Sequence, residues 1–390
     1  MTSSEHGTDA VWYRFEFTGT AGEYFTIWIV NLLLSVITLG IYSAWAKVRT
    51  LAYFYGHTTI NGSGFSFTAD PVKILKGRIV AVCLFGVYWV TTKFYPEHVL
   101  WAVSVLLLLF PFLLVTALSF RLRNTAFRNI RFHFNPDFAG AYRIFIVPVL
   151  IILALTWVFY SMLETSDLVH RMQQASKGQF HVTDMLISIL LLSAMVFIPY
   201  FVYLRSRFMV EHASYGSSTA RFNAGAWDYY KYHLLAVLMF AGVGFVASFL
   251  FGLLAVFARV ASHNAHGPAH PELLGIGMVV LIYGVGFFIL GYLNARLTNL
   301  TVSAIEFGGN RLQCRMRAMA VGWIYLSNTI AIILSLGLLI PWAMVRMARY
   351  KAACTEIQEQ DFNSIVAVAQ PDRSAIGEEI IDVFDFDIGF

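Results

Sequence analysis

The sequence is poor in charged residues. Only 13% of its 390 residues are charged, whereas a soluble domain carries about 25%. It is equally unlike a disordered chain, because 58% of its residues are hydrophobic and the mean hydropathy is +0.65. About 20 apolar residues cross a bilayer as one helix, so this content excludes an ordinary soluble enzyme and predicts a multi-pass membrane protein.

Cysteine and catalytic motifs are also scarce. The three cysteines, Cys83, Cys314 and Cys354, are far apart and odd in number, so they imply no disulfide framework. The first residues lack a basic stretch followed by an apolar one, and we expect no cleaved signal peptide. No His-Glu-x-x-His, Gly-x-Ser-x-Gly or Walker A pattern is present. We therefore expect no enzymatic activity and no cofactor.

Eight apolar stretches are long enough to be considered as membrane segments. The second to the seventh have the length and composition of plain spanning helices, while the first and the last are interrupted. The eight stretches lie near 24–46, 78–95, 99–119, 142–163, 185–204, 234–258, 273–295 and 323–344.

The cations are concentrated in alternate connections. Most of the 27 Lys and Arg residues lie in the four segments 47–78, 120–143, 205–233 and 296–322. Because cytoplasmic loops of membrane proteins are enriched in Lys and Arg, these four segments are predicted to be cytoplasmic. The net charge of +4 thus informs orientation, and we expect no nucleic-acid partner.

The basic segments resemble one another. In the first two, Thr, Phe-x-Phe and Asp recur at one offset, in 57–70 and 124–137, and looser copies follow in the third and fourth. Alternating Phe residues after a Gly, Asn or Ser turn indicate a short β-hairpin. We favour hairpins that pair into a small sheet below the helices. The alternative is a set of interfacial loops whose Phe residues enter the lipid.

The first and last apolar segments form a second repeat. Residues 31–60 match residues 328–357 at a constant offset of 297, including Asn31/Asn328 and Gly40/Gly337. A glycine in the middle of each segment favours the end of a helix. If each segment enters and leaves on one side, the cations that follow both breaks lie on the cytoplasmic side. Both termini are then cytoplasmic.

At these residues the chain resembles the YjgN-like family of bacterial inner-membrane proteins of unknown function. The resemblance covers nearly the whole chain. It depends on Phe15–Gly19, Thr38–Arg49, the Thr-x-Ile-x-Gly-x-x-Phe-x-Phe turn at 58–67 and the acidic tail Asp382–Phe390. It implies a location in the bacterial inner membrane, and it implies no activity.

Two sets of residues are candidate sites. Asn31 and Asn328, with Gly40 and Gly337, lie equivalently in the two broken segments and are candidates for ligand binding; the alternative for the two amides is hydrogen bonding between helices. Three histidines in one external loop, His263, His266 and His270, have the residue type for zinc or copper. For these we favour a solvated loop without metal.

These observations predict an all-α polytopic membrane protein, an internally repeated helical bundle with short β-hairpins in the cytoplasmic loops. The predicted function is a transporter or channel for an unidentified solute. The alternative is a non-catalytic scaffold or accessory subunit that binds an unknown protein partner through the hairpins and the acidic tail. Lipid is the other expected partner.

The predicted domain organisation has three parts. They are an N-terminal cytoplasmic segment 1–23, a membrane domain 24–354 with repeats near 13–78, 120–143, 205–233 and 296–357, and an acidic cytoplasmic tail 355–390.

The charge distribution yields a labelling prediction. In a cysteine-free background, a single cysteine at Ser63 should be protected from a membrane-impermeant thiol reagent in intact cells, because the basic segments face the cytoplasm. A cysteine at Asn264 should react. Alkaline phosphatase fused after Phe390 should be inactive, and labelling at Ser63 in intact cells would contradict the orientation.

Overall fold

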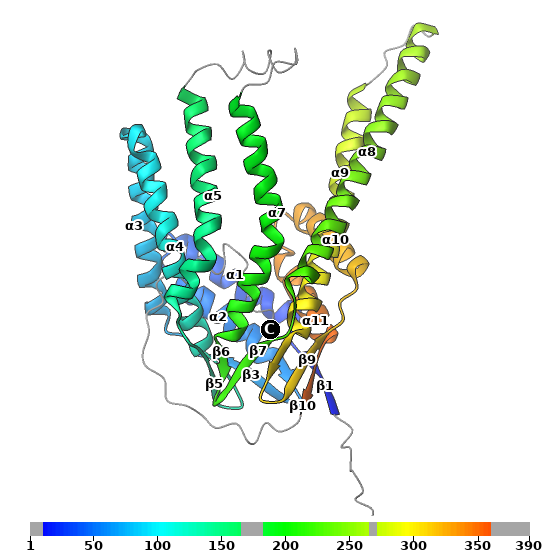
Figure 1. Cartoon of the computed structure of the whole chain (residues 1–390). Helices are drawn as coiled ribbons and strands as arrows, with labels where there is room; N and C mark the ends of the chain where they lie inside the picture. The colour runs from blue at the N-terminus through cyan, green and yellow to red at the C-terminus, as the bar shows by residue number, and fades with distance from the viewer. Residues whose placement is uncertain (1–10, 165–181, 265–270, 360–390) are drawn as a thin grey trace, which may run out of the picture.

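The computed structural model describes residues 11–164, 182–264 and 271–359. Within these ranges, short strands form a barrel at one end of the molecule, and helices rise in pairs from the same rim of that barrel (Figure 1). Each pair lies between two strands, so the described chain consists of five strand–helix pair–strand units.

The ten described strands form one closed antiparallel barrel. The two strands that flank a helix pair are bonded to each other, short hairpins join neighbouring units, and β1 pairs with β10 to close the ring. The strands are β1 (Val11–Phe17), β2 (Thr58–Ile60), β3 (Ser63–Phe67), β4 (Thr125–Phe127), β5 (Ile130–Phe134), β6 (Ala213–Tyr215), β7 (Ser218–Phe222), β8 (Ile305–Phe307), β9 (Asn310–Cys314) and β10 (Thr355–Glu359).

The helix pairs fall into two classes of length. Three pairs are long, and the pairs in the first and last units are short, with 17 and 15 residues in each case. The long pairs are α3 (Pro71–Phe94) with α4 (Val99–Arg123), α5 (Phe138–Glu164) with α7 (Val182–Glu211), and α8 (Ala226–Asn264) with α9 (Pro271–Ser303); a 3-10 turn, η1 (Pro96–His98), joins the first of them. The short pairs are α1 (Ala21–Ile37) with α2 (Ser43–His57), and α10 (Ala318–Leu334) with α11 (Ile340–Cys354).

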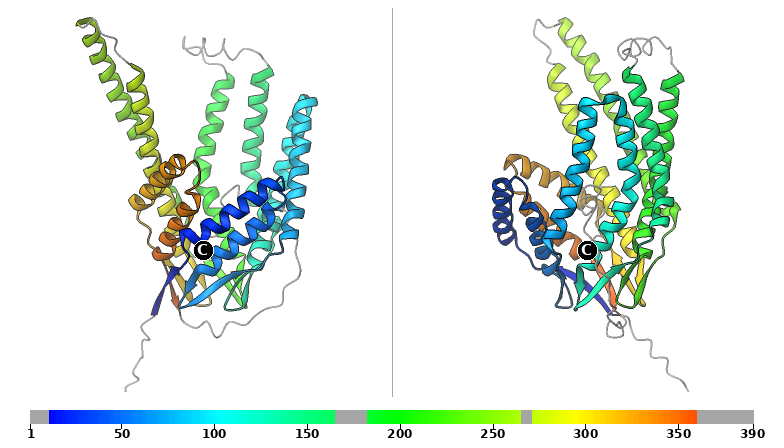
Figure 2. Two further views of the ribbon diagram at one scale, coloured as in Figure 1. Left: turned by 180° about the vertical axis from the view of Figure 1, so that it is seen from behind. Right: turned by 90° about the vertical axis from the view of Figure 1, so that its left-hand side faces the viewer.

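The short pairs turn back toward the barrel. Leu39 and Gly40 have φ of +51° and +91°, and Leu336 and Gly337 have φ of +51° and +92°, so both helix breaks predicted from the glycines are confirmed. Helices of 17 residues are shorter than the roughly 20 needed to cross a bilayer. Figure 2 shows both short pairs beside the upper rim of the barrel, below the tops of the long pairs.

Strand register fixes which side chains fill the barrel. One residue pair in each unit, such as Phe65 with Phe127, points inward at the same level. The ten side chains of this apolar layer are Phe15, Ile60, Phe65, Phe127, Phe132, Tyr215, Ala220, Phe307, Leu312 and Ile357. The space left among them is about 20 Å³, room for about one water molecule.

The barrel overturns the predicted fold class. The four local hairpins are confirmed, but an all-α bundle with isolated hairpins is wrong, because every hairpin is joined to its neighbours. A strand of three to five residues has two edges of unpaired backbone groups, and closure is the arrangement that removes all of them. The sequence shows the turns, such as Asn61–Gly62 with φ of +47° and +74°, but not pairing across a helix pair.

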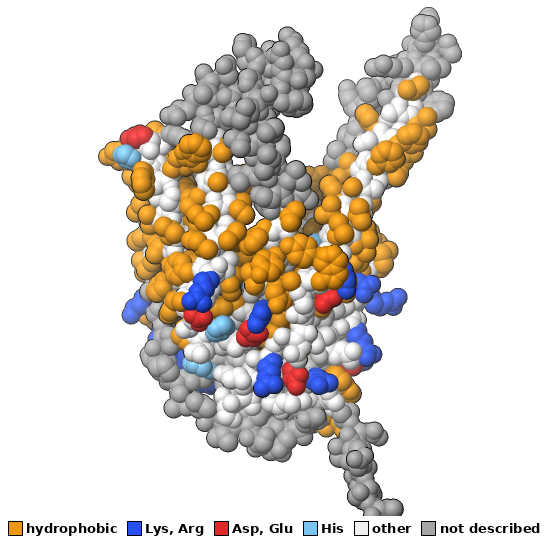
Figure 3. Space-filling view, viewed as in Figure 1, with side chains coloured by type: hydrophobic (Ala, Val, Ile, Leu, Met, Phe, Trp, Pro, Cys, Tyr) orange, Lys and Arg blue, Asp and Glu red, His pale blue; other side chains and the backbone are white. Residues whose placement is uncertain are grey.

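Hydrophobic side chains cover the helical part of the molecule. Four described helical segments are long and apolar enough to cross a membrane: Pro71–Phe94, Pro96–Arg123, Phe138–Leu155 and Ala226–Leu253. Helices α7 and α9 coincide with two more predicted spans, but parts of both fall outside the described side chains, so the number of six spans stays a prediction. In Figure 3, Lys and Arg gather where the orange helical surface gives way to the barrel.

The apolar layer should carry much of the barrel's stability. Phe65 is 6% exposed within it, and Phe65→Ala should lower the free energy of unfolding by about 3–5 kcal/mol, because it opens a cavity in a packed core. Phe85 on α3 is 65% exposed and is the matched control, for which Phe85→Ala should change stability by less than about 1 kcal/mol. Thermal unfolding in detergent compares the two, and an equal loss would contradict the packed layer.

Candidate functional site

A cavity of about 330 Å³ lies where the first and last units meet the barrel. Helix α2 forms one wall and α11 the other, while Phe15 of the apolar layer lies at its floor. The lining residues are Phe15, Thr50, Leu51, Phe54, Tyr55, Thr58, Arg121, Met344, Met347, Ala348, Lys351, Ala352 and Thr355. We call this space the cationic cavity, because its charged lining residues are Arg121 and Lys351.

The two cations reach the cavity from equivalent positions. Each lies four residues before the first residue of a strand, Arg121 before Thr125 of β4 and Lys351 before Thr355 of β10. In both units the threonine hydroxyl donates a hydrogen bond to the carbonyl of the cation residue, at 3.0 Å and 2.9 Å. Arg121 is 6% exposed. Both cationic side chains therefore come from the last turn of a helix that leads directly into a barrel strand.

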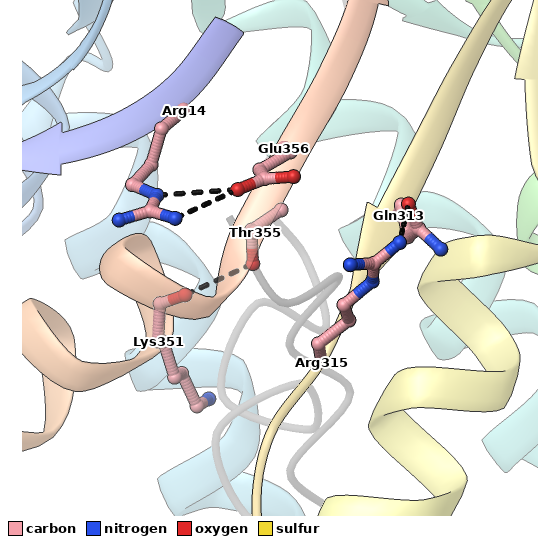
Figure 4. A network of polar contacts seen from close by, with 6 residues as sticks. All are labelled: Arg14, Gln313, Arg315, Lys351, Thr355 and Glu356. Atoms are coloured by element: carbon pink, nitrogen blue, oxygen red, sulfur yellow. Dashed lines mark hydrogen bonds and ion pairs between the residues drawn. The ribbon is translucent and has the colours of Figure 1, made fainter. Parts of the chain in front are cut away.

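Lys351 has an available ammonium group. It makes no hydrogen bond or ion pair through Nζ within the described chain, and its side chain points away from the nearby ion pair of Arg14 with Glu356 (Figure 4). Arg14 Nη2 lies 2.9 Å from Glu356 Oε1, and this pair joins β1 to β10 on the barrel's outer surface. Glu356 is thus engaged by Arg14 rather than by Lys351.

The apolar layer of the barrel, to which the lining residue Phe15 belongs, is closely packed and carries no charged side chain. Tyr215 in the apolar layer donates a hydrogen bond from its hydroxyl to the Phe127 carbonyl at 2.8 Å, and burial raises the pKa of Tyr215 to about 12. The ring of Phe65 lies 4.7 Å from that of Phe127, and that of Phe132 lies 4.9 Å from that of Tyr215. An anion in the cavity would meet positive charge on its walls and an apolar surface below.

The structure places the predicted binding residues away from this cavity. Asn31 and Asn328 are buried in the two short pairs, where each Nδ2 donates to an alanine carbonyl of the partner helix at 3.4 Å. The acceptors, Ala46 and Ala343, are themselves 297 residues apart. Gly40 and Gly337 form the turns and do not line the cavity. These contacts match the helix-to-helix alternative, while ligand binding by the four residues stays a prediction.

The two amides differ in one respect. Arg346 donates from Nη1 to Asn328 Oδ1 at 2.9 Å and to Ser327 Oγ at 2.7 Å. Its equivalent, Arg49, donates to the Tyr42 hydroxyl at 3.2 Å. Asn31 Oδ1 is consequently buried without a hydrogen-bond partner among the described residues.

The histidine loop cannot be placed. His263 is near the end of α8, where side chains are not described, and His266 and His270 lie outside the described residues. The described part of the chain contains no group of three potential metal ligands. Metal binding by the loop therefore stays a prediction.

The sequence did not single out Arg121 or Lys351 as site residues. Both counted only as cations beside a membrane segment, which predicted their side of the membrane and not their proximity. Their common position four residues before a strand is a signal present in the sequence. It becomes useful only once β4 and β10 are known to belong to one barrel.

Comparisons with known proteins identify the family. A family model described as a bacterial protein of unknown function (DUF898) matches residues 12–383. The inner membrane protein YjgN of Escherichia coli strain K12 is 24% identical over 386 residues, 93% of each chain. The YjgN protein of Salmonella typhimurium strain LT2 is 32% identical over 149 residues, 37% of each chain. No solved structure matches the chain. The predicted family and the predicted inner-membrane, transmembrane location are confirmed.

The different hydrogen bonding of Asn31 and Asn328 predicts that their substitution has different effects on stability. Asn328→Leu should lower the free energy of unfolding by about 2 kcal/mol, because it removes one of the two acceptors of the Arg346 guanidinium and the amide's bond to Ala343. Asn31→Leu should cost less than about 1 kcal/mol, because it removes one weak bond and one unpaired acceptor. Thermal unfolding of the two purified variants in detergent measures the difference. Equal destabilisation would refute the asymmetry.

Proposed function

The chain belongs to the DUF898 family, and from this premise we propose that it is a non-enzymatic inner-membrane carrier that binds a small organic anion in the cationic cavity. The observation that carries the proposal is the lining of that cavity. Its walls are mainly apolar, and among the described lining residues the charged groups are Arg121 and Lys351, with no Asp or Glu. Such a surface complements a ligand with an apolar body and an anionic group.

The size of the cavity supports a ligand of modest dimensions. Its volume of about 330 Å³ is near the lower end of the range for small-molecule sites, about 300–1,000 Å³. The ligand would place its anionic group near Lys351, whose ammonium is available, and its apolar part against Leu51, Phe54 and Met347.

The filled barrel favours a carrier over an open pore. The cavity ends at Phe15, and the layer below leaves about 20 Å³, so a solute passes only if units move apart. The first and last units supply both long walls and have glycine turns with positive φ between their helices. Broken helices around a central site are typical of secondary transporters.

The lining also supports the absence of catalysis. Among the lining residues that the structure describes there is no His, Cys, Asp or Glu, four residue types that commonly act as nucleophile or general base. The Thr58 and Thr355 hydroxyls donate to backbone carbonyls at 2.8 Å and 2.9 Å. We therefore expect bound ligand to be recovered unchanged.

The scaffold function is the weaker alternative. It was predicted to use the hairpins and the acidic tail, whose residues 360–390 lie outside the described ranges, and binding through the hairpins requires a free strand edge that accepts a partner strand. Every strand in the described ranges already has two bonded neighbours, so such a partner would have to displace an existing pair.

A retention experiment tests the carrier proposal. The full chain, purified in mild detergent, should retain an anionic compound of a few hundred daltons that native mass spectrometry detects. Lys351→Gln should reduce retention about tenfold, because it removes the charge of a hydrogen-bonded ion pair with the ligand. Lys351→Arg should keep most of it.

The control is a lysine outside the cavity. Lys93 lies in the last turn of α3, and Lys93→Gln should leave retention unchanged. Retention that is equal in the Lys351→Gln and wild-type chains would refute the site, and recovery of a chemically altered ligand would refute the non-enzymatic function.

A further inference from the structure

A second cationic surface lies on the side of the last unit. Helices α10 and α11, with Ala21 at the start of α1, line a groove of about 660 Å³. Its aromatic and cationic lining residues are Trp323, Trp342, Arg346, Arg349 and Tyr350. We call it the α10–α11 groove. The cationic cavity shares none of these residues.

The two arginines are positioned but not neutralised. Arg346 uses Nη1 for Ser327 and Asn328, and its guanidinium carbon lies 5.1 Å from the centre of the Trp342 ring. Arg349 donates from Nη2 to the Gly19 carbonyl at 3.0 Å. Neither forms an ion pair with a carboxylate in the described parts of the chain, and each retains further N–H groups. Two fixed guanidinium groups in one groove are suited to phosphate oxygens.

The groove also has the features of a membrane interface. Trp323 is 58% exposed and Trp342 is 37% exposed, and α10 is an apolar helix too short to cross a bilayer. Tryptophan is enriched at the level of lipid headgroups, and cytoplasmic leaflets attract Lys and Arg. The band of cations in Figure 3 lies at the boundary between the apolar helices and the barrel.

We propose that the α10–α11 groove binds the phosphate of an anionic phospholipid. Arg346 and Arg349 hold the phosphate oxygens, while the exposed Trp323 ring contacts the glycerol and upper acyl region of the same lipid. The apolar surface of α10 continues this contact toward the bilayer. The occupant is a lipid rather than a free ion because the groove combines its charges with exposed apolar rings.

The first unit lacks this site although it repeats the fold. Thr20 N donates to the Tyr53 hydroxyl at 2.8 Å, and the equivalent Arg317 N donates to the Tyr350 hydroxyl at 2.9 Å, so the two units share this contact at matching positions. At the positions of Trp323 and Arg349, the first unit has Thr26 and Ala52.

The first unit also carries an acid at the corresponding place. Glu23 stands where the last unit has Ala320, and its carboxylate accepts hydrogen bonds from Thr20 N at 3.3 Å and from the Tyr53 hydroxyl at 3.2 Å. A carboxylate there repels a lipid phosphate. Lipid binding is therefore a property of the last unit, and the first unit supplies an internal control.

Native mass spectrometry of the full chain in a non-ionic detergent tests the proposal. The protein is titrated with phosphatidylglycerol and, separately, with phosphatidylcholine. Wild-type protein should bind phosphatidylglycerol at least about fivefold more tightly than phosphatidylcholine. Arg349→Gln should abolish about this fivefold preference, since one cation near an anionic lipid changes its affinity by roughly that factor. Arg349→Lys should retain most of the preference for phosphatidylglycerol, and Trp323→Ala should weaken the binding of both lipids.

The matched control is Arg49→Gln, which removes the cation of the first unit equivalent to Arg346. It should leave the lipid preference unchanged. An equal loss in Arg49→Gln would mean diffuse surface attraction and would overturn the site, as would equal affinity of the wild type for the two lipids. Displacement of the lipid by millimolar inorganic phosphate would assign the groove to a free anion instead. Arg349→Gln keeps the Arg346–Asn328 contact and removes the Arg349–Gly19 hydrogen bond, so its unfolding temperature in detergent should fall only slightly, which shows that a loss of lipid preference is not a loss of fold.

Discussion

Pairing between the two strands that flank each helix pair is the interaction on which the rest of the structure depends. A strand of three residues, such as β2 or β4, cannot be stable with a free edge. In the barrel each strand has a hairpin neighbour on one side and the other strand of its own unit on the other. Because the flanking strands are bonded, both ends of every helix pair are held at one rim, which compels each pair to leave and return on the same side.

This constraint explains why helix length varies while the barrel does not. Helix α8 has 39 residues and α11 has 15, yet both connect to strands of the same ring. The barrel fixes only the spacing of the helix ends near the rim. Long pairs can therefore enter the bilayer and short pairs can stay at its surface without disturbing strand register, and the apolar layer at Phe65 and Phe127 is the same in either case.

The sequence predicted the local elements and missed their assembly, for a physical reason. Asn61–Gly62 and Gly40 are turn signals because a positive φ is needed at those residues, and both were located correctly. The pairing of Phe65 with Phe127 joins residues on either side of α3 and α4, and no local pattern encodes it. The cavity could not be predicted from the sequence for the same reason. Arg121 and Lys351 come from helices that meet only after β1 and β10 close the ring.

The first and last units are sequence repeats of each other, and the positions at which they differ are informative. Equivalent residues that keep their identity, Tyr53 and Tyr350 or Asn31 and Asn328, make equivalent backbone contacts and hold the short pairs together. Equivalent residues that differ include a surface pair, Ala52 and Arg349, of which Arg349 lines the α10–α11 groove. Folding requires the shared contacts, so it constrains the first class. Arg349 belongs to the second class: one of its N–H groups donates to the Gly19 carbonyl, and the guanidinium lines the groove, where its remaining N–H groups can meet a ligand of opposite charge.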